Sequence, residues 1–492
     1  MRKLLSKVKE KHIVFAIMLL GIFARGFLIW RVPGGLNQDE AYAGYEAYSL
    51  LHYGMDSWGY HFPVYFISWG SGMNVLESYL MIPFVAVFGL TKFAIRLPQL
   101  IVACISLYVF YKLLREIFGY ESRGVYAGFL YFAVCPWHIM LSRWALESNL
   151  APGFLLFGLY FFITGRRNPK YYMLSALFYG LSLYAYATIW VIVPFIIILQ
   201  VLYLLWTREL KISRYLFFAV LILFLLALPL LLFMAVNYYG WLDEIRTPFF
   251  SVPKLIASRG KEIDFWRKRE NLDNLYKVIA TQWDGYDHNA TVRFGLYYKW
   301  GLFVGVAGFA YGIIRAFKSI VKRKCDVVAM LLPQFIMSVI LGCLIYVNIN
   351  RINSIHIPII AFISVGIVFV CDMLYGKSKK FLGVICTALL VSFLLFEYNY
   401  FTGYRELMDW VFGEGTGELI EYTLENAASD EAVYVDPDIN YAKVLFYSRM
   451  PVEEFISTVE YKNYPSKYLS VYKMGRFVFD MENAPKGAVR IE

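Results

Sequence analysis

The sequence NQDEAY, residues 37–42, follows directly after the first long apolar run of this chain. Two neighbouring carboxylates, Asp39 and Glu40, therefore stand where a membrane helix ends and water begins. A charge is costly in hydrocarbon, so a carboxylate pair at the mouth of a membrane helix indicates a functional site. Loops that follow membrane helices also carry acids that have no function, and the rest of the chain has to separate these two interpretations.

The composition is typical of a membrane protein. Of the 492 residues, 59% are hydrophobic and 17% are charged, which is more apolar than a soluble globular protein of this length. Several separate apolar runs approach the ~20 residues that cross a bilayer. The six Cys show neither metal-ligand spacing nor a disulfide framework. The first apolar run lacks a small-residue cleavage site and is expected to be a signal anchor.

Basic residues gather in short clusters between the apolar runs, so the net charge of +10 indicates a cytoplasmic membrane face rather than nucleic-acid binding. Counted from a cytoplasmic N-terminus, this pattern predicts eleven crossings. They are expected at residues 13–30, 98–111, 124–141, 150–165, 172–187, 189–206, 215–236, 294–316, 326–347, 355–374 and 381–396. The short apolar run at 75–90 is predicted to be re-entrant or interfacial, because a crossing there would put the basic cluster at 112–123 outside. Arg25 is expected to face protein or a cavity.

We therefore predict an all-α polytopic membrane domain over residues 1–396, with external loops and juxtamembrane helices at 31–97 and 237–293. From residue 397 the charge density rises and the long apolar runs stop. Residues 397–492 are expected to form a small α/β domain on the extracytoplasmic side. Its helices are expected at 418–426 and 440–447, and its strands at 432–435, 469–471 and 477–479.

Asp39 is the first candidate for catalysis, together with Glu40. Partial desolvation at a membrane mouth strengthens the pull of a carboxylate on a proton. A carboxylate there could act as general base on an acceptor hydroxyl or amine. Its oxygen atoms could also hold a divalent cation.

Glu147 is the second acidic candidate. The predicted topology puts it on the same face as Asp39, at the start of a crossing and four residues after Arg143. A helix-start acid is also favoured by the helix dipole or by an i,i+4 pair with Arg143. Together with Asp39, however, Glu147 is expected to form half of a shared site.

Arg351 lies in the sequence NINRINSIHIP, residues 348–358, at the predicted outer edge of two crossings. An external Arg opposes the positive-inside trend and needs a partner. A phosphate is suitable, because guanidinium binds phosphate oxygens bidentately. A structural pair with an external acid is the alternative.

The other candidates are weaker. Four further side chains are taken as candidate substrate contacts, namely Tyr42, His61, His138 and Arg143. In the second external loop, Asp284, Asp287 and His288 could bind a metal ion, although loop acids beside Gly also simply make turns. A divalent cation is thus the only cofactor that we consider, and no cofactor is certain.

The absence of nucleotide-binding motifs argues against ATP bound by this chain as the energy source. The sequence contains neither a phosphate-binding P-loop nor a dinucleotide fingerprint in a βαβ context. A transferase on the external face then needs a donor that reaches it through the membrane. A lipid-phosphate sugar fits, because its phosphate is the leaving group and carries the activation.

Several segments match one known family in order and spacing, over roughly residues 10–400. They are Asp39-Glu40, Gly54 to Gly72 with FPVYF at 62–66, Arg96-Leu97-Pro98, Cys135-Pro136-Trp137-His138, Ser142-Arg143 leading to Glu147, and Arg351 with Pro358. With these segments the chain resembles the GT-C superfamily of membrane glycosyltransferases. The resemblance is to its glycosyltransferase family 39-like branch of protein O-mannosyltransferases and aminoarabinose transferases.

The resemblance implies a polyprenyl-phosphate-linked sugar donor, an external active site and an inverting transfer. Asp39 matches the catalytic acid of the family, and Glu147 matches a second acidic position. Arg351 would neutralise the donor phosphate. The basic residue that some members carry in the first external segment has no clear counterpart near residues 66–69, and Gln38 replaces the usual residue before the acidic pair.

We therefore predict a multi-pass cell-membrane glycosyltransferase, mannosyltransferase-like, that moves a sugar from a polyprenyl phosphate to a lipid, a cell-wall glycopolymer or a protein on the extracytoplasmic face. Membrane lipids and an unknown acceptor are its other partners, and nucleic acid is not. A carrier or flippase for lipid-linked sugars would use the same cavity without chemistry, but no internal repeat of the transporter kind is found. A scaffold that binds a wall polymer would leave Asp39 and Glu147 unexplained. The prediction requires Asp39, Glu147 and Arg351 to meet in one wet hollow.

Overall fold

A computed structural model gives the fold and describes residues 2–257, 266–375, 380–480 and 488–491. Part of the predicted external loop 237–293 and part of the predicted domain 397–492 lie outside the described residues. The first half of the chain is almost wholly helical. Its helices are α1 (Arg2–Gly26), α2 (Gln38–Tyr53), α3 (Leu76–Phe88), α4 (Lys92–Phe118), α5 (Val125–Ala133), α6 (Pro136–Leu141), α7 (Glu147–Gly165), α8 (Tyr171–Ser182), α9 (Thr188–Trp206) and α10 (Arg214–Asn237).

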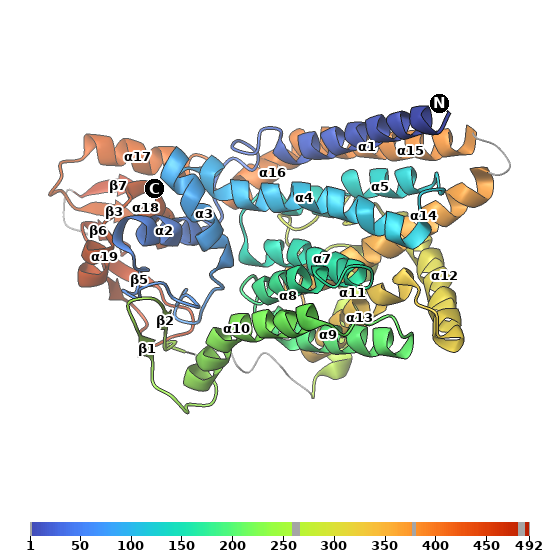
Figure 1. The fold of residues 1–492 in the computed structure, drawn as a ribbon. Coiled ribbons are helices and arrows are strands. Elements are labelled where there is room, and N and C mark those ends of the chain that lie inside the picture. Colours follow the sequence, from blue (N-terminus) through green and yellow to red (C-terminus); the bar gives the residue numbers. More distant parts are fainter. Residues whose placement is uncertain (1, 258–265, 376–379, 481–487, 492) are drawn as a thin grey trace.

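The second half begins with a short hairpin and continues with further long helices. Its elements before the C-terminal domain are β1 (Ile245–Arg246), β2 (Ser251–Val252), α11 (Lys268–Thr281), α12 (Gly301–Lys322), the 3₁₀ helix η1 (Val327–Leu331), α13 (Leu332–Leu344), the 3₁₀ helix η2 (Asn353–Ile355), α14 (His356–Tyr375) and α15 (Lys380–Phe401). The long helices lie side by side in Figure 1, where α7 packs against α8, α8 against α10, and α12 against α14.

Eight helical stretches within the described residues are long and apolar enough to cross a membrane. They are Lys92–Phe118, Glu147–Gly165, Thr188–Trp206, Arg214–Asn237, Gly301–Lys322, Val327–Leu344, Asn353–Leu374 and Lys380–Phe401. The membrane-protein class is thereby confirmed. Length and composition support eight of the eleven predicted crossings, and the other three fall on α1, on α5 with α6, and on α8.

The predicted crossing at 124–141 is not one helix. It divides into α5 and α6 because Pro136 has no backbone N–H to continue the ladder, and instead occupies the first turn of α6. The apolar run at 75–90 forms α3, whose 13 residues are fewer than a spanning helix needs. Its predicted place at the membrane surface remains a prediction.

The C-terminal part folds as a small mixed domain of helices and strands. Its elements are α16 (Gly403–Phe412), α17 (Thr416–Asn426), β3 (Val433–Val435), α18 (Tyr441–Ser448), α19 (Val452–Thr458), β4 (Glu460–Tyr461), β5 (Val471–Met474), β6 (Phe477–Val478) and β7 (Val489–Ile491). The strands form one sheet of order β4-β5-β6-β3-β7, in which β3 is parallel to β6 and β7, and the other pairs are antiparallel. This confirms the predicted α/β character, including α17, α18, β3 and β6, and places β5 later than the strand predicted at 469–471, whereas α16, α19, β4 and β7 were not foreseen.

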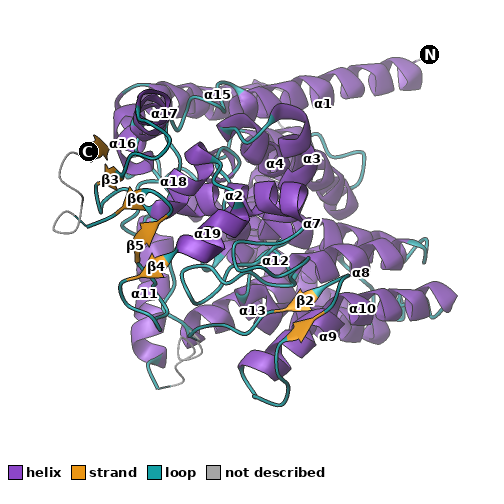
Figure 2. Ribbon diagram, turned by 90° about the vertical axis from the view of Figure 1, so that its left-hand side faces the viewer, coloured by secondary structure: helices purple, strands orange, loops and turns teal. Residues whose placement is uncertain are grey.

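Helix α2 joins this domain to the membrane helices (Figure 2). It packs against α18 on one side and α3 on the other. Tyr45 of α2 donates a hydrogen bond from its hydroxyl to the Met450 carbonyl at 2.8 Å. The site described below therefore lies where the membrane helices and the C-terminal domain meet.

Candidate functional site

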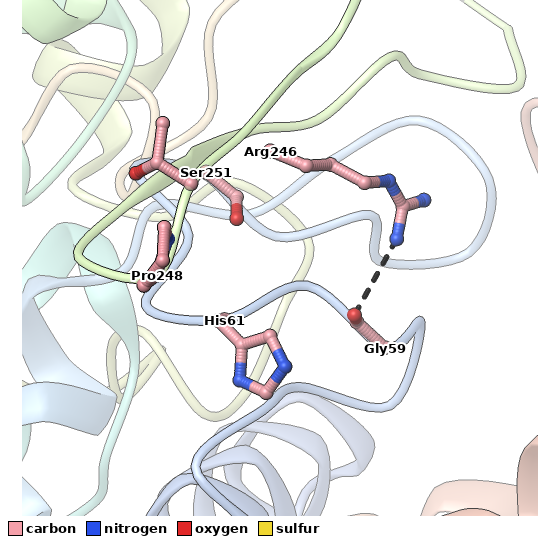
Figure 3. Close-up of a pocket in the computed structure, with 6 residues that line it drawn as sticks. Gly59, His61, Arg246, Pro248 and Ser251 are labelled. Atoms are coloured by element: carbon pink, nitrogen blue, oxygen red, sulfur yellow. Dashed lines mark hydrogen bonds between the residues drawn. The ribbon is translucent and has the colours of Figure 1, made fainter.

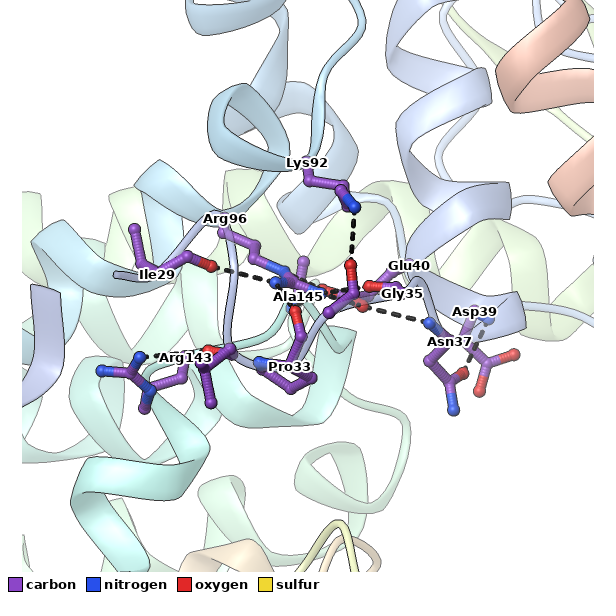
Figure 4. A network of polar contacts seen from close by, with 12 residues as sticks. Ile29, Pro33, Gly35, Asn37, Asp39, Glu40, Lys92, Arg96, Arg143 and Ala145 are labelled. Carbon is purple, nitrogen blue, oxygen red and sulfur yellow. Dashed lines mark hydrogen bonds and ion pairs between the residues drawn. The ribbon is translucent and has the colours of Figure 1, made fainter. Parts of the chain in front are cut away.

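Asp39 is placed by the capping of α2. Asn37 caps this helix, because its side-chain oxygen accepts the backbone N–H of Asp39 at 2.9 Å, while its own N–H donates to Glu40 Oε2 at 3.1 Å. Successive residues of a helix point about 100° apart. Figure 4 shows the consequence, since Glu40 turns inward and the Asp39 carboxylate points away from it.

Asp39 lines a polar cavity of about 400 Å³ together with Glu147 and Arg351. The structure thus brings the three predicted residues to one hollow, although they come from the start of α2, the start of α7 and the segment before η2. Other polar side chains from six separate segments complete its wall. They are Gln38, Ser68, Ser148, Asn348, Asn350, Asn440, Tyr468 and Ser470.

Glu147 is the first residue of α7. Its carboxylate accepts the backbone N–H of Asn74 in a short hydrogen bond. The adjacent residue Ser148 offers its carbonyl to Asn353 Nδ2 at 3.1 Å. The start of α7 is therefore fixed both to the loop before α3 and to the segment that carries Arg351. No ion pair of Glu147 with Arg143 is needed to explain its position.

Arg351 is held by its own loop. Its backbone N–H donates to Asn348 Oδ1 at 2.7 Å, and its Nη1 donates to the Tyr346 carbonyl at 3.3 Å. Asp284 Oδ2 accepts the backbone N–H of Ile349 at 2.8 Å and so fixes the same loop from outside. The guanidinium is half-buried and lines the cavity.

The weak metal candidates have other partners. Asp284 Oδ2 also accepts Asn289 Nδ2 at 2.9 Å, and its Oδ1 accepts the Tyr286 N–H at 3.1 Å, as expected of a turn-forming acid. His288 packs edge-on against Trp144, with ring centroids 5.3 Å apart, and Asp287 accepts the Tyr404 hydroxyl through its carbonyl. Among the residues that the structure describes, no group of three or more His, Cys, Asp and Glu side chains could hold a metal ion.

A second, more apolar cavity of about 440 Å³ adjoins the polar one. It lies between α9, α10 and α13, and Trp190, Val191 and Met234 are in its wall. The two cavities share four lining residues, namely Gly72, Glu147, Tyr186 and Arg351. Glu147 and Arg351 thus lie at the junction between the polar cavity and the apolar cavity.

Glu40 does not reach either cavity. Its side chain is wholly buried and accepts Arg96 Nε at 2.8 Å and Arg96 Nη2 at 3.1 Å, as well as the backbone N–H of Ala145 at 2.8 Å. Arg96 uses its remaining donors on the carbonyls of Ile29, Pro33 and Gly35. The structure therefore does not bring Glu40 to the cavity that Asp39 lines, and holds it in a bracing contact with Arg96 instead.

Three predicted substrate contacts are also internal. Arg143 is buried and donates to four carbonyls at the end of α1 and beyond, including that of Phe27 at 2.7 Å. His138 is buried, and its Nδ1 accepts Arg25 Nε at 3.0 Å. Tyr42 donates to the Ile67 carbonyl at 2.9 Å. None of the three lines the two cavities, whereas the predicted protein-facing position of Arg25 is confirmed.

His61 lies in a different place. It lines a separate pocket of about 350 Å³ with Arg246, Pro248 and Ser251, between the segment around Gly59 and the β1–β2 hairpin (Figure 3). Its Nδ1 is 3.0 Å from the Gly54 carbonyl oxygen. The structure therefore does not bring His61 to Asp39.

Two buried acids stand behind the site on α2 and the loop after it. Glu46 accepts the backbone N–H of Ser57 at 2.9 Å, and Asp56 Oδ1 accepts the N–H groups of Trp58 and Tyr60. Burial raises the pKa of Glu46 to about 7. The pKa of Asp56 is raised well above its ordinary value by burial and by the nearby Glu46 charge. These acids were not predicted from the sequence.

Comparison with known proteins was made on sequence and on structure. Residues 75–233 match the model of the family described as dolichyl-phosphate-mannose-protein mannosyltransferase. No curated protein matches the sequence. Among solved structures, ArnT from Cupriavidus metallidurans in the apo state is similar, with a TM-score of 0.55 and 11% identity over 91% of this chain and 85% of that one.

Two ligand-bound structures share the fold. ArnT bound to undecaprenyl phosphate gives a TM-score of 0.53 with 11% identity, over 89% of this chain and 84% of that one. The archaeal oligosaccharyltransferase AglB from Archaeoglobus fulgidus, in complex with an inhibitory peptide and a dolichol-phosphate, gives 0.53 with 13% identity, over 91% of this chain and 64% of that one. The resemblance found in the sequence is thereby confirmed: residues 75–233 match the dolichyl-phosphate-mannose-protein mannosyltransferase family, and the chain is similar in fold to ArnT and to AglB.

Proposed function

We propose that this protein is a membrane glycosyltransferase that transfers a sugar from a polyprenyl-phosphate donor to an acceptor nucleophile on the extracytoplasmic face. The observation that carries the proposal is the junction of the two cavities at Glu147 and Arg351. A lipid-linked sugar has an apolar chain, an anionic phosphate and a polar ring, in that order. The apolar cavity, the guanidinium and the polar cavity follow one another in the same order.

The chemistry follows from the residues of the polar cavity. Asp39 takes the proton from the acceptor hydroxyl or amine as that group attacks the anomeric carbon. The bond between the anomeric carbon and the phosphate oxygen breaks, and the phosphate leaves with the bonding electron pair. Arg351 stabilises the charge on the leaving phosphate. Attack in line with the leaving group inverts the anomeric configuration.

Glu147 has a supporting role in this proposal. Its carboxylate lies at the shared wall, where it can orient Arg351 or the acceptor without taking the place of Asp39. Glu40, which the sequence suggested as a partner of Asp39, has no part in the reaction because its oxygens are engaged with Arg96.

The test is a transfer assay with purified protein in nanodiscs, a panel of radiolabelled undecaprenyl-phosphate hexoses, and an envelope fraction as acceptor. We expect consumption of one donor and labelled product, and a fall of about 10²–10⁴-fold for Asp39→Asn. Asp243→Asn, at a carboxylate that is 98% exposed, is the control and should keep full transfer. Full transfer by Asp39→Asn would contradict the base assignment.

A carrier for lipid-linked sugars is the alternative, and proteoliposomes separate it from the transferase. Movement of the labelled lipid across the bilayer without its consumption would favour the carrier. Mass spectrometry of the envelope glycans and lipids of a deletion strain would show which sugar is missing, and so identify both the donor sugar and the acceptor.

A further inference from the structure

The loop from Phe66 to Asn74 runs along both cavities and is rigid. Phe66 and Met73 exchange backbone hydrogen bonds of 2.9 and 3.1 Å, and the N–H groups of Ser71 and Gly72 both donate to the Ser68 carbonyl at 2.9 Å. Gly72 has a φ of +140°, and a Cβ at this position would lie 2.2 Å from Tyr65 Cε1. The loop therefore holds its side chains in fixed positions without a ligand.

Two polar side chains of this loop are buried and unsatisfied. Asn74 is 2% exposed and lines the apolar cavity, and neither its amide nitrogen nor its amide oxygen meets a hydrogen-bond partner in the described part of the chain. Ser68 is 1% exposed and lines the polar cavity, and its hydroxyl likewise has no partner among the described residues. Buried polar groups are nearly always paired, so each of these requires an explanation.

The places of these groups indicate what pairs with them. Asn74 is tied by its backbone N–H to the Glu147 carboxylate, which belongs to the shared wall of the two cavities. Ser68 lines the polar cavity with Asp39. Both side chains therefore lie close to the junction where Arg351 would hold the donor phosphate, Asn74 next to the shared-wall residue Glu147 and Ser68 in the polar cavity.

Their chemistry indicates a neutral, hydroxyl-bearing ligand. An amide and a hydroxyl each donate and accept hydrogen bonds, and neither carries a charge. A sugar ring offers the same mixed donors and acceptors, whereas a phosphate offers acceptors and is suited to Arg351. We infer that Asn74 and Ser68 are positioning residues that bind hydroxyl groups of the donor sugar. This inference rests on the proposed function and adds the sugar subsite to it.

The test compares lipids that differ only in the sugar. Binding of undecaprenyl phosphate and of undecaprenyl-phosphate glucose, galactose and mannose to the full-length protein in nanodiscs is measured by native mass spectrometry. We expect the wild type to bind at least one sugar lipid more tightly than undecaprenyl phosphate. Asn74→Ala and Ser68→Ala should each lower the affinity for that sugar lipid by about tenfold. The affinity for undecaprenyl phosphate should stay within about twofold of the wild-type value.

A stability measurement separates positioning from a structural role. Asn74→Ala removes an amide that has no partner, so the melting temperature of the ligand-free protein should stay the same or rise. Asn289→Ala is the matched control, because the Asn289 amide is also buried but donates to Asp284 at 2.9 Å. This control should lower the melting temperature and leave the preference for the sugar lipid unchanged.

The outcomes are distinct. If the loop variants weaken both kinds of lipid equally, or keep the preference for the sugar lipid, the sugar subsite is wrong while the proposed donor stands. A wild type that binds undecaprenyl phosphate but gains nothing from any of the three sugars also contradicts the subsite. Absence of binding to every one of these lipids would overturn the subsite and the proposed function together.

Discussion

Glu40 and Arg96 form an ion pair in which neither side chain is exposed to solvent, with Oε1 and Nε 2.8 Å apart. Arg96 also donates to three backbone carbonyls, and Glu40 also accepts two backbone N–H groups. The pair therefore joins the end of the first helical region, the start of α2 and the start of α4. The pair thereby fixes the orientation of α2, and so the direction in which the neighbouring residue Asp39 points.

Removing one partner of this pair should destabilise the protein. Arg96→Ala leaves the Glu40 carboxylate buried and uncompensated, at a cost of about 3–5 kcal/mol in the free energy of unfolding. Thermal denaturation in detergent should show a large fall in melting temperature. Lys254→Ala breaks an exposed pair with Asp243, in which the two charged atoms are 3.7 Å apart, and should change the melting temperature little. Equal effects of both variants would contradict the bracing role.

Arg351 should recognise the phosphate of the donor. Replacement of Arg351 by Ala is expected to lower the affinity for undecaprenyl phosphate by about tenfold to a hundredfold. The affinity for undecaprenol, which has no phosphate, should stay the same. Arg351→Lys should restore only part of the loss, since Lys lacks the bidentate fork. Arg293→Ala, at an exposed guanidinium outside both cavity walls, is the control. Equal losses for both lipids would place the phosphate elsewhere.

The apolar cavity should accept the polyprenyl chain. Val191 lines this cavity on α9, whereas Leu202 on the same helix is 55% exposed and faces outward. A Trp at position 191 fills the cavity, so Val191→Trp should lower the donor affinity by about tenfold. Leu202→Trp should leave it unchanged. Titration with undecaprenyl phosphate in nanodiscs checks both, and an unaffected Val191→Trp would exclude this route for the lipid.

Glu46 should make stability depend on pH. Its pKa of about 7 in the folded protein lies above its ordinary value of 4.5, so the folded state binds more protons than the unfolded state between these limits. Stability contributed by Glu46 should therefore fall as the pH rises from about 4.5 to about 7. Glu46→Gln should flatten the curve of melting temperature against pH and stabilise the protein at pH 8 relative to wild type.

The control for this effect is Glu425→Gln, at an exposed position of α17. It should leave the curve of melting temperature against pH as in the wild type. If the Glu46→Gln variant kept the wild-type dependence of melting temperature on pH between about 4.5 and about 7, Glu46 would not be the titrating group.

The sequence was sufficient for the fold class and for the three residues that line one cavity. Apolar runs and basic clusters indicated the membrane helices, and a few polar residues at their ends indicated Asp39, Glu147 and Arg351. It was insufficient for the helix count, because a Pro interrupts the apolar run at Pro136 but lies inside α7 at Pro152, and the sequence alone does not separate the two cases.

The roles of neighbouring residues were also beyond sequence reasoning. Asp39 and Glu40 are adjacent and chemically alike, yet only the direction of α2 decides which of them faces the cavity. A buried Arg binds carbonyls as readily as phosphate, so Arg143 resembled a substrate contact. Ser68 and Asn74 could not be predicted as site residues, because Ser and Asn are common in loops. Only the structure shows that their buried side chains lack a hydrogen-bond partner among the described residues.

The hydrogen bond from Asn440 to Gln38 joins residues 402 positions apart, and both line the polar cavity. During synthesis, the side of the cavity that contains Gln38 is made long before the side that contains Asn440. The wall of this cavity is therefore complete only after the segment around residue 440 has been made and has packed against the start of α2.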